Sequence, residues 1–293
     1  MLSVLIPVFN WDIRNLVQAI HQQCEKAGVP FEILSVDDCS SKSELKERNN
    51  SLELPKFRYI LLEQNVGNAE ARNILARNAQ FEWLLFLDAD MMPAKDTFIQ
   101  LYLQEIQKGD FDIMSGGIVY EEKVADEYFL KWIHGKSTEE QILGKDPYLE
   151  IRGNNFLVRK PIFLANPFGG LPESYGYVDT HFGLKLKQAK ARVKIIHNPC
   201  VHLGLETNEN FVRKNRYSVR NAFWLYHNHP EIAQNLRLIQ TYKRLKKWGL
   251  VIPIGLIFKL TEKLLLKNLH SKHPSLLLFQ FYKLGYLSTL KQE

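Results

Sequence analysis

The sequence predicts an α/β fold with a mostly parallel central sheet flanked by helices, followed by a basic helical extension at the C-terminus. Short apolar segments alternate with amphipathic helical segments at the spacing of βαβ crossovers. Polar or acidic residues follow four of the apolar segments, where open α/β sheets bind their ligands. Beyond about residue 221 the pattern turns helical and basic.

Hydrophobic periodicity places the elements of the N-terminal part. Residues 2–8 form an apolar run that predicts a buried strand, and residues 12–27 predict a helix that Gly28 and Pro30 end. The remaining strands are expected at 31–36, 57–62 and 83–87, with a helix at 69–79.

The C-terminal half is less regular. We expect a strand at 111–119 interrupted by Gly116-Gly117, a long connection or short helices at 121–150, a helix at 180–191 and a strand at 193–197. The change of pattern predicts two domains, a main domain at 1–220 and a helical, basic extension at 221–293.

Composition sets outer limits on the class of protein. The chain has 293 residues, of which 45% are hydrophobic, so it can bury a sizeable core. Its three cysteines are too few for a disulfide framework or a zinc site, and we expect reduced thiols. The N-terminus enters a strand without a basic region or cleavage site, so we expect no secretory signal and a cytoplasmic protein.

The basic charge is concentrated at the C-terminus. The formal net charge is +6, but residues 236–293 carry +9 and the first 235 residues carry −3. A basic footprint spread over the main domain is therefore absent, which argues against nucleic-acid binding.

The most informative segment is the apolar run from Trp83 to Leu87, which ends in Asp88-Ala89-Asp90. In a strand, residues two apart point to the same side, so the two carboxylates would share one edge of the sheet. Paired carboxylates at such an edge suit a divalent ion that substrate phosphates also hold. The same spacing occurs at ordinary strand-to-turn junctions, so this motif alone leaves both interpretations open.

Three other strand ends carry polar residues too, at 7–10, 37–41 and 65–73. Asp, Asn, Ser and Gly favour turns, so each end has an independent structural explanation. A single nucleotide lying across the carboxyl edge of the sheet would explain all four ends at once.

Together these segments resemble the family-2 inverting glycosyltransferases of bacteria. The resemblance rests on a set of motifs in a fixed order, which are Ile6-Pro7-Val8-Phe9-Asn10, Val36-Asp37-Asp38-Cys39-Ser40-Ser41, Asn65-Val66-Gly67 with Ala71-Arg72-Asn73, Phe86-Leu87-Asp88-Ala89-Asp90, Gly153-Asn154-Asn155-Phe156 and the acceptor-side segment 175–186. It spans roughly residues 2–215. It implies a GT-A, Rossmann-like fold and transfer of a sugar from a nucleoside diphosphate donor.

The resemblance also implies residue roles in donor and metal binding. Phe9 would stack on the donor base, Asp38 would accept hydrogen bonds from base or ribose, and Arg72 would face base or diphosphate. The remaining donor-binding residues would be Pro7, Asp88 and Asn154. Asp90 and His202 would bind Mn²⁺ or Mg²⁺, and the imidazole favours manganese. The alternatives are a surface salt bridge for Arg72 and a structural role for His202.

Asp179 is the candidate general base. Inversion requires a base that takes the proton of the acceptor hydroxyl while its oxygen attacks the anomeric carbon. Asp179 precedes an expected helix, whose N-terminus would stabilise the carboxylate, although a helix N-cap is the competing interpretation. Val178 occupies the position where the family usually has glutamate, which leaves the acceptor open.

The implied reaction moves a hexose from a UDP-sugar to a hydroxyl of a glycan or lipid-linked acceptor, in polysaccharide biosynthesis. Phe9 and Asp38 are also compatible with guanosine or thymidine. The alternatives are a non-catalytic relic that binds sugar nucleotides, a metal-dependent phosphohydrolase, which shares the Asp-x-Asp pattern, and a nucleotidyltransferase.

The basic extension predicts a contact with an anionic membrane surface. Lys259, Lys263 and Lys267 recur every four residues beside an apolar line of leucines. The uncharged run at 248–258 is too short to span a bilayer. We therefore expect a helix that lies peripherally on the inner face of the cell membrane. The alternative is a helix that packs on the main domain or on a second subunit.

Overall fold

The computed structural model describes residues 1–140 and 146–291. The chain divides into two compact units. The first comprises Met1–Glu121, Glu139–Gly169 and Phe182–Gly204, and the second comprises Glu122–Thr138, Gly170–His181 and Leu205–Glu293. The predicted division at residue 220 falls within a helix and stays a prediction.

A seven-stranded sheet organises the first unit, in the order β3-β2-β1-β4-β8-β6-β9. Its strands are β1 (Leu2–Val8), β2 (Phe31–Asp37), β3 (Phe57–Leu61), β4 (Trp83–Leu87), β6 (Ile113–Ser115), β8 (Asn155–Arg159) and β9 (Val193–Ile195). Strands β1, β2, β3 and β4 run parallel to one another, whereas β8 runs antiparallel to β4 and β6. The prediction of a mostly parallel sheet is confirmed.

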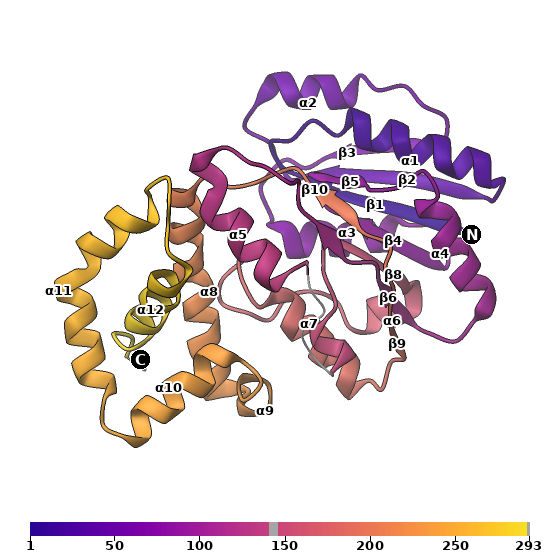
Figure 1. Cartoon of the computed structure of the whole chain (residues 1–293). Coiled ribbons are helices and arrows are strands. Elements are labelled where there is room, and N and C mark those ends of the chain that lie inside the picture. The colour runs from indigo at the N-terminus through magenta and orange to yellow at the C-terminus, as the bar shows by residue number, and fades with distance from the viewer. Residues whose placement is uncertain (141–145, 292–293) are drawn as a thin grey trace. The chain divides into compact units, whose positions relative to one another are not determined.

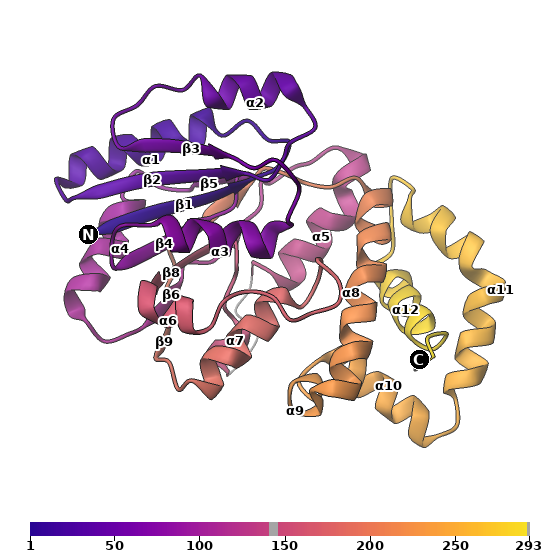
Figure 2. The ribbon, with the colours of Figure 1, turned by 180° about the vertical axis from the view of Figure 1, so that it is seen from behind.

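Helices cover both faces of this sheet, with α1 (Arg14–Ala27) and α4 (Phe98–Lys108) on one face and α3 (Asn68–Asn78) and α6 (Lys160–Ala165) on the other (Figures 1 and 2). The apolar face of α1 is buried, as its periodicity predicts. Gly28 ends α1 in the left-handed conformation, with φ +67°.

The interrupted strand at 111–119 separates into β6 and β7 (Ile118–Val119). Between them, Gly117 has a φ of +83°, which a β-strand does not allow. As a result β7 joins a second sheet, in which β10 (Cys200–His202) lies between β5 (Met91–Pro93) and β7.

The predicted connection at 121–150 contains η1 (Asp126–Tyr128), α5 (Phe129–Thr138) and η2 (Pro147–Leu149), while residues 141–145 lie outside the described part. The helix expected at 180–191 is α7 (Val178–Gln188), which begins in the second unit and continues in the first. Periodicity gave no indication of α2 (Ser43–Asn50), α4, α6, β5 or β8.

The second unit is helical. Besides α5 it contains α8 (Asn208–Asn228), α9 (Pro230–Ala233), α10 (Arg237–Lys247), α11 (Val251–Leu269) and α12 (Leu276–Leu287). Helix α12 lies between α8 and α11 (Figures 1 and 2). Their shared core is apolar and consists of Leu130, Phe211, Val212, Phe258, Leu265, Leu269, Phe279 and Tyr282.

Candidate active site

The turn that follows β4 brings Asp90 against His202. The Asp88 N–H donates to the Asn154 carbonyl at 3.2 Å, so the chain leaves β4 beside β8. Strand β5 then pairs antiparallel with β10, with Met91 opposite His202. This register places His202 Nε2 3.2 Å from Asp90 Oδ2.

The other ring nitrogen of His202 has its own partner. Nδ1 lies 3.3 Å from the Tyr120 hydroxyl, which donates to Glu139 Oε2 at 2.5 Å. Because the Tyr120 hydroxyl donates its hydrogen bond to the carboxylate, its oxygen lone pair can accept a hydrogen bond from His202 Nδ1–H. In that tautomer Nε2 would carry the lone pair that a metal-binding histidine requires.

The backbone around Asp90 leaves no room for a side chain at position 204. A Cβ on Gly204 would lie 2.2 Å from Asp90 Oδ2. The neighbouring Leu203 N–H donates to the Asp90 carbonyl at 2.9 Å. Gly204 therefore allows the close approach that brings Asp90 and His202 together.

Asp90 and His202 fit a divalent ion as two of its ligands. Across residues 1–140 and 146–291, no group of three or more His, Cys, Asp or Glu side chains is arranged to hold a metal. An ion at this pair would therefore need further oxygen ligands, and diphosphate oxygens are suitable ones. Such a pair could therefore hold an ion only together with a phosphorylated substrate.

Arg72 and Asp88 form an ion pair beside the same turn. Arg72 projects from α3, is 5% exposed, and its Nη2 lies 2.5 Å from Asp88 Oδ1 and 3.0 Å from the Gly153 carbonyl. It thereby ties the end of β4 to the segment before β8. Arg72 is thus not a surface arginine. Its guanidinium is not fully hydrogen-bonded either, because its Nε is buried without a hydrogen-bond partner in the described structure.

Asn154 has unused hydrogen-bonding capacity in the same segment. Its Oδ1 is buried, and no hydrogen bond reaches it from the described residues. A buried oxygen without a partner is costly. A ligand hydroxyl would satisfy Asn154 Oδ1, just as a phosphate oxygen would satisfy Arg72 Nε.

The two aspartates at the end of β2 accept hydrogen bonds from within the protein. Asp38 accepts from the Val66 N–H at 2.6 Å and from the Gly67 N–H at 2.9 Å, and thereby fixes the loop that leads into α3. Burial raises the pKa of Asp38, and the two N–H donors oppose that rise. Asp37 accepts from the Tyr59 hydroxyl and the Ser40 N–H. A bound ligand could therefore form hydrogen bonds only with the carboxylate lone pairs of Asp38 that the two backbone N–H groups leave unused.

Phe9 offers an aromatic face at the end of β1. It is 53% exposed, whereas Pro7, two residues earlier, is buried within the strand. The chain turns at Asn10, which has a φ of +54°, and the Asn10 N–H donates to Ser40 Oγ at 2.8 Å. The backbone next to Phe9 is thus fixed to the loop that follows β2.

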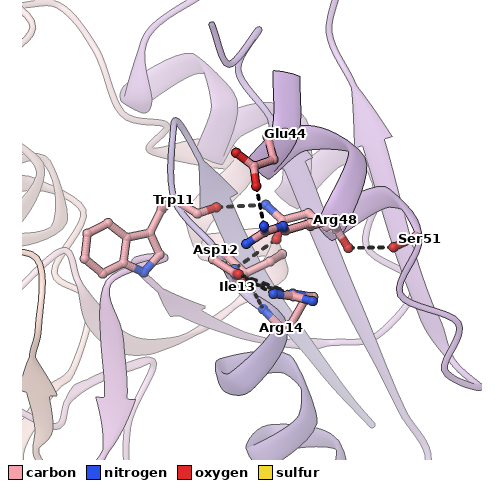
Figure 3. Close-up of polar contacts among 8 residues, drawn as sticks. Trp11, Asp12, Ile13, Arg14, Glu44, Arg48 and Ser51 are labelled. Atoms are coloured by element: carbon pink, nitrogen blue, oxygen red, sulfur yellow. Dashed lines mark hydrogen bonds and ion pairs between the residues drawn. The ribbon is translucent and has the colours of Figure 1, made fainter. Parts of the chain in front are cut away.

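The loop after Phe9 is anchored to α2. The buried Asn49 accepts from the Ile13 N–H at 3.0 Å and donates to the Trp11 carbonyl at 2.8 Å. Figure 3 shows the Trp11 carbonyl turned toward this network and the indole ring directed away from it. Side-chain pairs of Asp12 with Arg14 and of Glu44 with Arg48 complete the network. The loop that follows Phe9 is therefore anchored through its backbone.

Asp179 lies in the first turn of α7, in the second unit. The segment before it is fixed by Asn221 of α8, whose Nδ2 donates to the carbonyls of Glu173, Tyr175 and Gly176. Asn221 Oδ1 accepts from the Glu173 N–H at 3.0 Å. Asn221 is fully buried, so α8 determines how the chain enters the helix that carries Asp179.

The predicted residues thus fall into two groups. Those at the carboxyl ends of β1, β2 and β4 or beside them lie in the first unit, and they are Pro7, Phe9, Asp38, Arg72, Asp88, Asp90, Asn154 and His202. Asp179 belongs to the second unit. The sequence gave no indication of Tyr120, Glu139 or Asn221, because these residues act through contacts distant along the chain. Gly204 lies only two residues after His202 in the sequence, and this proximity along the chain was the one signal that could have indicated its role.

The fold, a mostly parallel sheet flanked by helices and followed by further helices, is of the GT-A type. The sequence model of glycosyl transferase family 2 matches residues 3–165, more than half of the chain. The chain therefore belongs to glycosyl transferase family 2, and the predicted resemblance is confirmed.

Curated relatives match shorter stretches. An uncharacterised glycosyltransferase of Haemophilus influenzae is 37% identical over 99 residues, which cover 32% of this chain and 32% of the relative. Glycosyltransferase GlyG of Streptococcus pneumoniae is 25% identical over 131 residues, covering 44% and 43%. The matched stretch spans about a third of the first relative and less than half of the second.

Two solved structures share the fold at low identity. A mannosyltransferase from Pyrobaculum calidifontis in complex with GDP-Man and Mn²⁺ has a TM-score of 0.54 and 15% identity, covering 98% of this chain and 84% of that one. Glucosyl-3-phosphoglycerate synthase from Mycobacterium tuberculosis, in complex with Mn²⁺, UDP and phosphoglyceric acid, has a TM-score of 0.51 and 14% identity, covering 77% and 78%. The predicted GT-A fold is confirmed.

Proposed function

We propose that this chain is a metal-dependent, inverting glycosyltransferase that moves a hexose from a nucleoside diphosphate-sugar to a hydroxyl of a glycan or lipid-linked acceptor. The observation that carries the proposal is the pairing of Asp90 with His202 at 3.2 Å, at the end of the strand that also delivers Asp88. The solved relatives hold Mn²⁺ with GDP-Man or with UDP, which supports the same ligand classes here. Of these donors we favour a UDP-sugar.

The donor would lie across the carboxyl edge of the sheet. Its base would stack on the exposed ring of Phe9, beside Pro7, and Asp38 would accept from base or ribose. Arg72 Nε and Asn154 Oδ1 would satisfy their unused hydrogen-bonding capacity on the diphosphate and on a hydroxyl. Asp88, oriented by Arg72, would meet the ribose or the donor sugar.

Asp90 and His202 would hold Mn²⁺ or Mg²⁺, with Tyr120 orienting the imidazole. When bound, the ion neutralises charge on the departing diphosphate. Imidazole beside carboxylate suits manganese better than carboxylates alone do.

Asp179 would act as the general base. Its carboxylate would take the proton of the acceptor hydroxyl as that oxygen forms a bond to the anomeric carbon. The bond from that carbon to the diphosphate breaks on the opposite face, and the configuration inverts. The carboxylate lies in the first turn of α7, where the helix dipole stabilises its charge. Val178 supplies no second carboxylate, so acceptor recognition would rest on other residues.

Thermal unfolding with UDP, GDP, TDP and CDP, each with and without Mn²⁺, tests donor and metal binding together. A ligand at ~100 times its dissociation constant adds about 2.7 kcal/mol to stability. We expect a manganese-dependent rise with one nucleotide, lost in Asp90→Ala and in His202→Ala. Asp96→Ala removes an exposed carboxylate of the same unit and should keep the response.

Two results would contradict the proposal. If no nucleotide changes the unfolding temperature, donor binding is wrong and a phosphohydrolase becomes the better hypothesis. If nucleotides bind but no sugar is transferred to any hydroxyl, including that of water, the chain is a non-catalytic relic.

A further inference from the structure

Helix α11 leaves an apolar face exposed. Four residues spaced at i, i+4 form this face, and their exposed fractions are 74% for Ile252, 56% for Leu256, 84% for Leu260 and 70% for Leu264. On the other side of the helix, Gly255, Phe258, Leu265 and Leu269 are buried. The helix therefore packs in the second unit with one face, and its other apolar face is mostly exposed.

A row of lysines lies beside the exposed apolar face. Lys259, Lys263 and Lys267 each follow a leucine of that face by three residues, so they occupy the adjacent line of the helix surface. Within the described residues, no ion pair engages these three lysines. Glu262 is the sole acidic residue between 236 and 291, and it pairs with Arg216 of α8. The exposed side of α11 is thus apolar and positively charged, with no carboxylate.

The turn before α11 is also exposed, apolar and next to basic residues. Trp248 is 68% exposed and directly follows Lys246 and Lys247 at the end of α10. Gly249, with a φ of +71°, lies in the same turn between α10 and α11. In Figures 1 and 2 this turn lies at the end of α11 away from the loop to α12. Tryptophan next to basic residues is typical of side chains at a membrane–water interface.

We propose that α11 and the Trp248 turn are the docking surface for an anionic lipid bilayer. The four exposed apolar side chains would enter the boundary between headgroups and acyl chains, and the lysines would contact lipid phosphates. No helix within residues 1–140 and 146–291 has the length and apolar character needed to cross a membrane. The contact would therefore lie in the plane of the surface.

Charge favours a membrane over a second copy of this chain. Pairing two α11 faces would bury their leucines but would set lysine rows against a surface that offers no carboxylate. An anionic bilayer supplies both the apolar phase and the counter-charges. The proposal goes beyond sugar transfer, and its failure would leave donor binding unaffected.

Co-sedimentation of the full chain with vesicles tests this surface. We expect binding to vesicles of phosphatidylcholine with phosphatidylglycerol and little binding to phosphatidylcholine alone. The triple variant Lys259→Gln, Lys263→Gln, Lys267→Gln should lower the partition coefficient ~100-fold, since each well-placed basic residue contributes about fivefold. The control removes three exposed lysines of the first unit, in Lys26→Gln, Lys95→Gln, Lys108→Gln, and should bind normally.

A second variant examines the apolar contribution. Leu256→Ser, Leu260→Ser, Leu264→Ser should bind at least ~10-fold more weakly while keeping its circular dichroism, because these side chains are exposed. Trp248 fluorescence should shift to the blue on binding, and Trp248→Phe should abolish the shift. Equal binding by the leucine variant, or no binding by the wild type, would overturn the proposal. A dimer without lipid that the leucine variant disrupts would assign the face to a second copy instead.

Discussion

His202 Nε2 lies 3.2 Å from Asp90 Oδ2, although 112 residues separate them along the chain. The contact depends on the antiparallel pairing of β5 with β10, which continues directly from the turn after β4. Tyr120 fixes the imidazole from its other side. The pairing of β5 with β10 thus places a carboxylate beside an imidazole whose other nitrogen has its own partner.

Removing the Tyr120 hydroxyl should weaken metal binding. In Tyr120→Phe the His202 Nδ1 loses its partner, and the ring is free to change its tautomer. We expect a ~10-fold lower Mn²⁺ affinity in the presence of the nucleotide, at the lower end for loss of a group that orients a ligand. Titration calorimetry measures it.

Tyr148→Phe is the matched control, because it removes a tyrosine hydroxyl that donates to the Ala191 carbonyl in the same unit. It should bind Mn²⁺ like the wild type. An unchanged affinity in Tyr120→Phe would show that Tyr120 does not orient His202.

Gly204→Ala should move Asp90. The added Cβ would meet Asp90 Oδ2 at 2.2 Å, so the carboxylate or the backbone must shift. We expect the manganese-dependent rise in unfolding temperature to fall by more than half, while any metal-independent rise from the nucleotide persists. Leu203→Ala, at the exposed neighbouring position, serves as the control. A full manganese response in Gly204→Ala would mean that Asp90 can move without affecting the site.

The local sequence pattern was sufficient to predict the main strands of the sheet and the position of Asp88 and Asp90 in the candidate site. The run from Trp83 to Leu87 is apolar throughout because β4 is buried on both faces, and a buried strand must end in a polar turn. Asp88 and Asp90 lie in that turn, so their place at the end of the strand could be predicted from the sequence. The glycines at 116 and 117 likewise marked the separation of β6 from β7.

The remaining contacts depend on pairings that periodicity does not encode. Strand β8 is only five residues long and runs antiparallel, and its Asn155 side chain bonds across to the Asn198 carbonyl and to Tyr102. Arg72 was expected at the donor or at the surface, but the structure buries it against Asp88. The sequence around Arg72 does not reveal this ion pair, because its partner Asp88 follows a different element, the strand β4.

Asp179→Asn should separate catalysis from donor binding. The amide keeps the shape of the side chain but cannot take a proton, so we expect turnover at least ~100-fold lower. Nucleotide binding, measured by thermal unfolding, should be unchanged. Asp126→Asn, an exposed position of the second unit, should keep full turnover. Wild-type turnover in Asp179→Asn would assign the base to another residue and leave Asp179 as a helix cap.

Asn221→Ala should affect the segment before Asp179. The variant leaves the carbonyls of Glu173, Tyr175 and Gly176 without their shared donor in a buried position. We expect a loss of about 2–4 kcal/mol in the free energy of unfolding, from a cavity and several unmade hydrogen bonds. Because Asn221 positions the segment before Asp179, Asn221→Ala should lower kcat more than it changes KM for the sugar donor.

Measurements below the unfolding transition of the variant keep the two effects of Asn221→Ala apart. Asn228→Ala removes an exposed asparagine of the same helix and is the control. A normal kcat in a destabilised Asn221→Ala would limit its role to stability.

Asp112 should contribute stability that acid removes. Its carboxylate accepts from the Arg192 backbone N–H at 2.9 Å and from the guanidinium at 3.0 Å, which joins β6 to the start of β9. These hydrogen bonds lower the pKa of Asp112. A lowered native pKa gives stability that is full above the unfolded pKa, about 3.9, and is lost as pH falls through the native pKa.

We therefore expect Asp112→Asn to unfold about 1 kcal/mol more easily at pH 7, a modest value because the Arg192 side chain is 54% exposed and solvent screens the pair. The gap from wild type should narrow below about pH 4, where the carboxyl of the unfolded chain begins to protonate, and should close as pH falls through the lower native pKa. Urea unfolding across this pH range measures it, with Asp96→Asn as a control that shows no gap. A gap that stays constant down to pH 2 would mean that Asp112 acts through shape and neutral hydrogen bonds rather than through its charge.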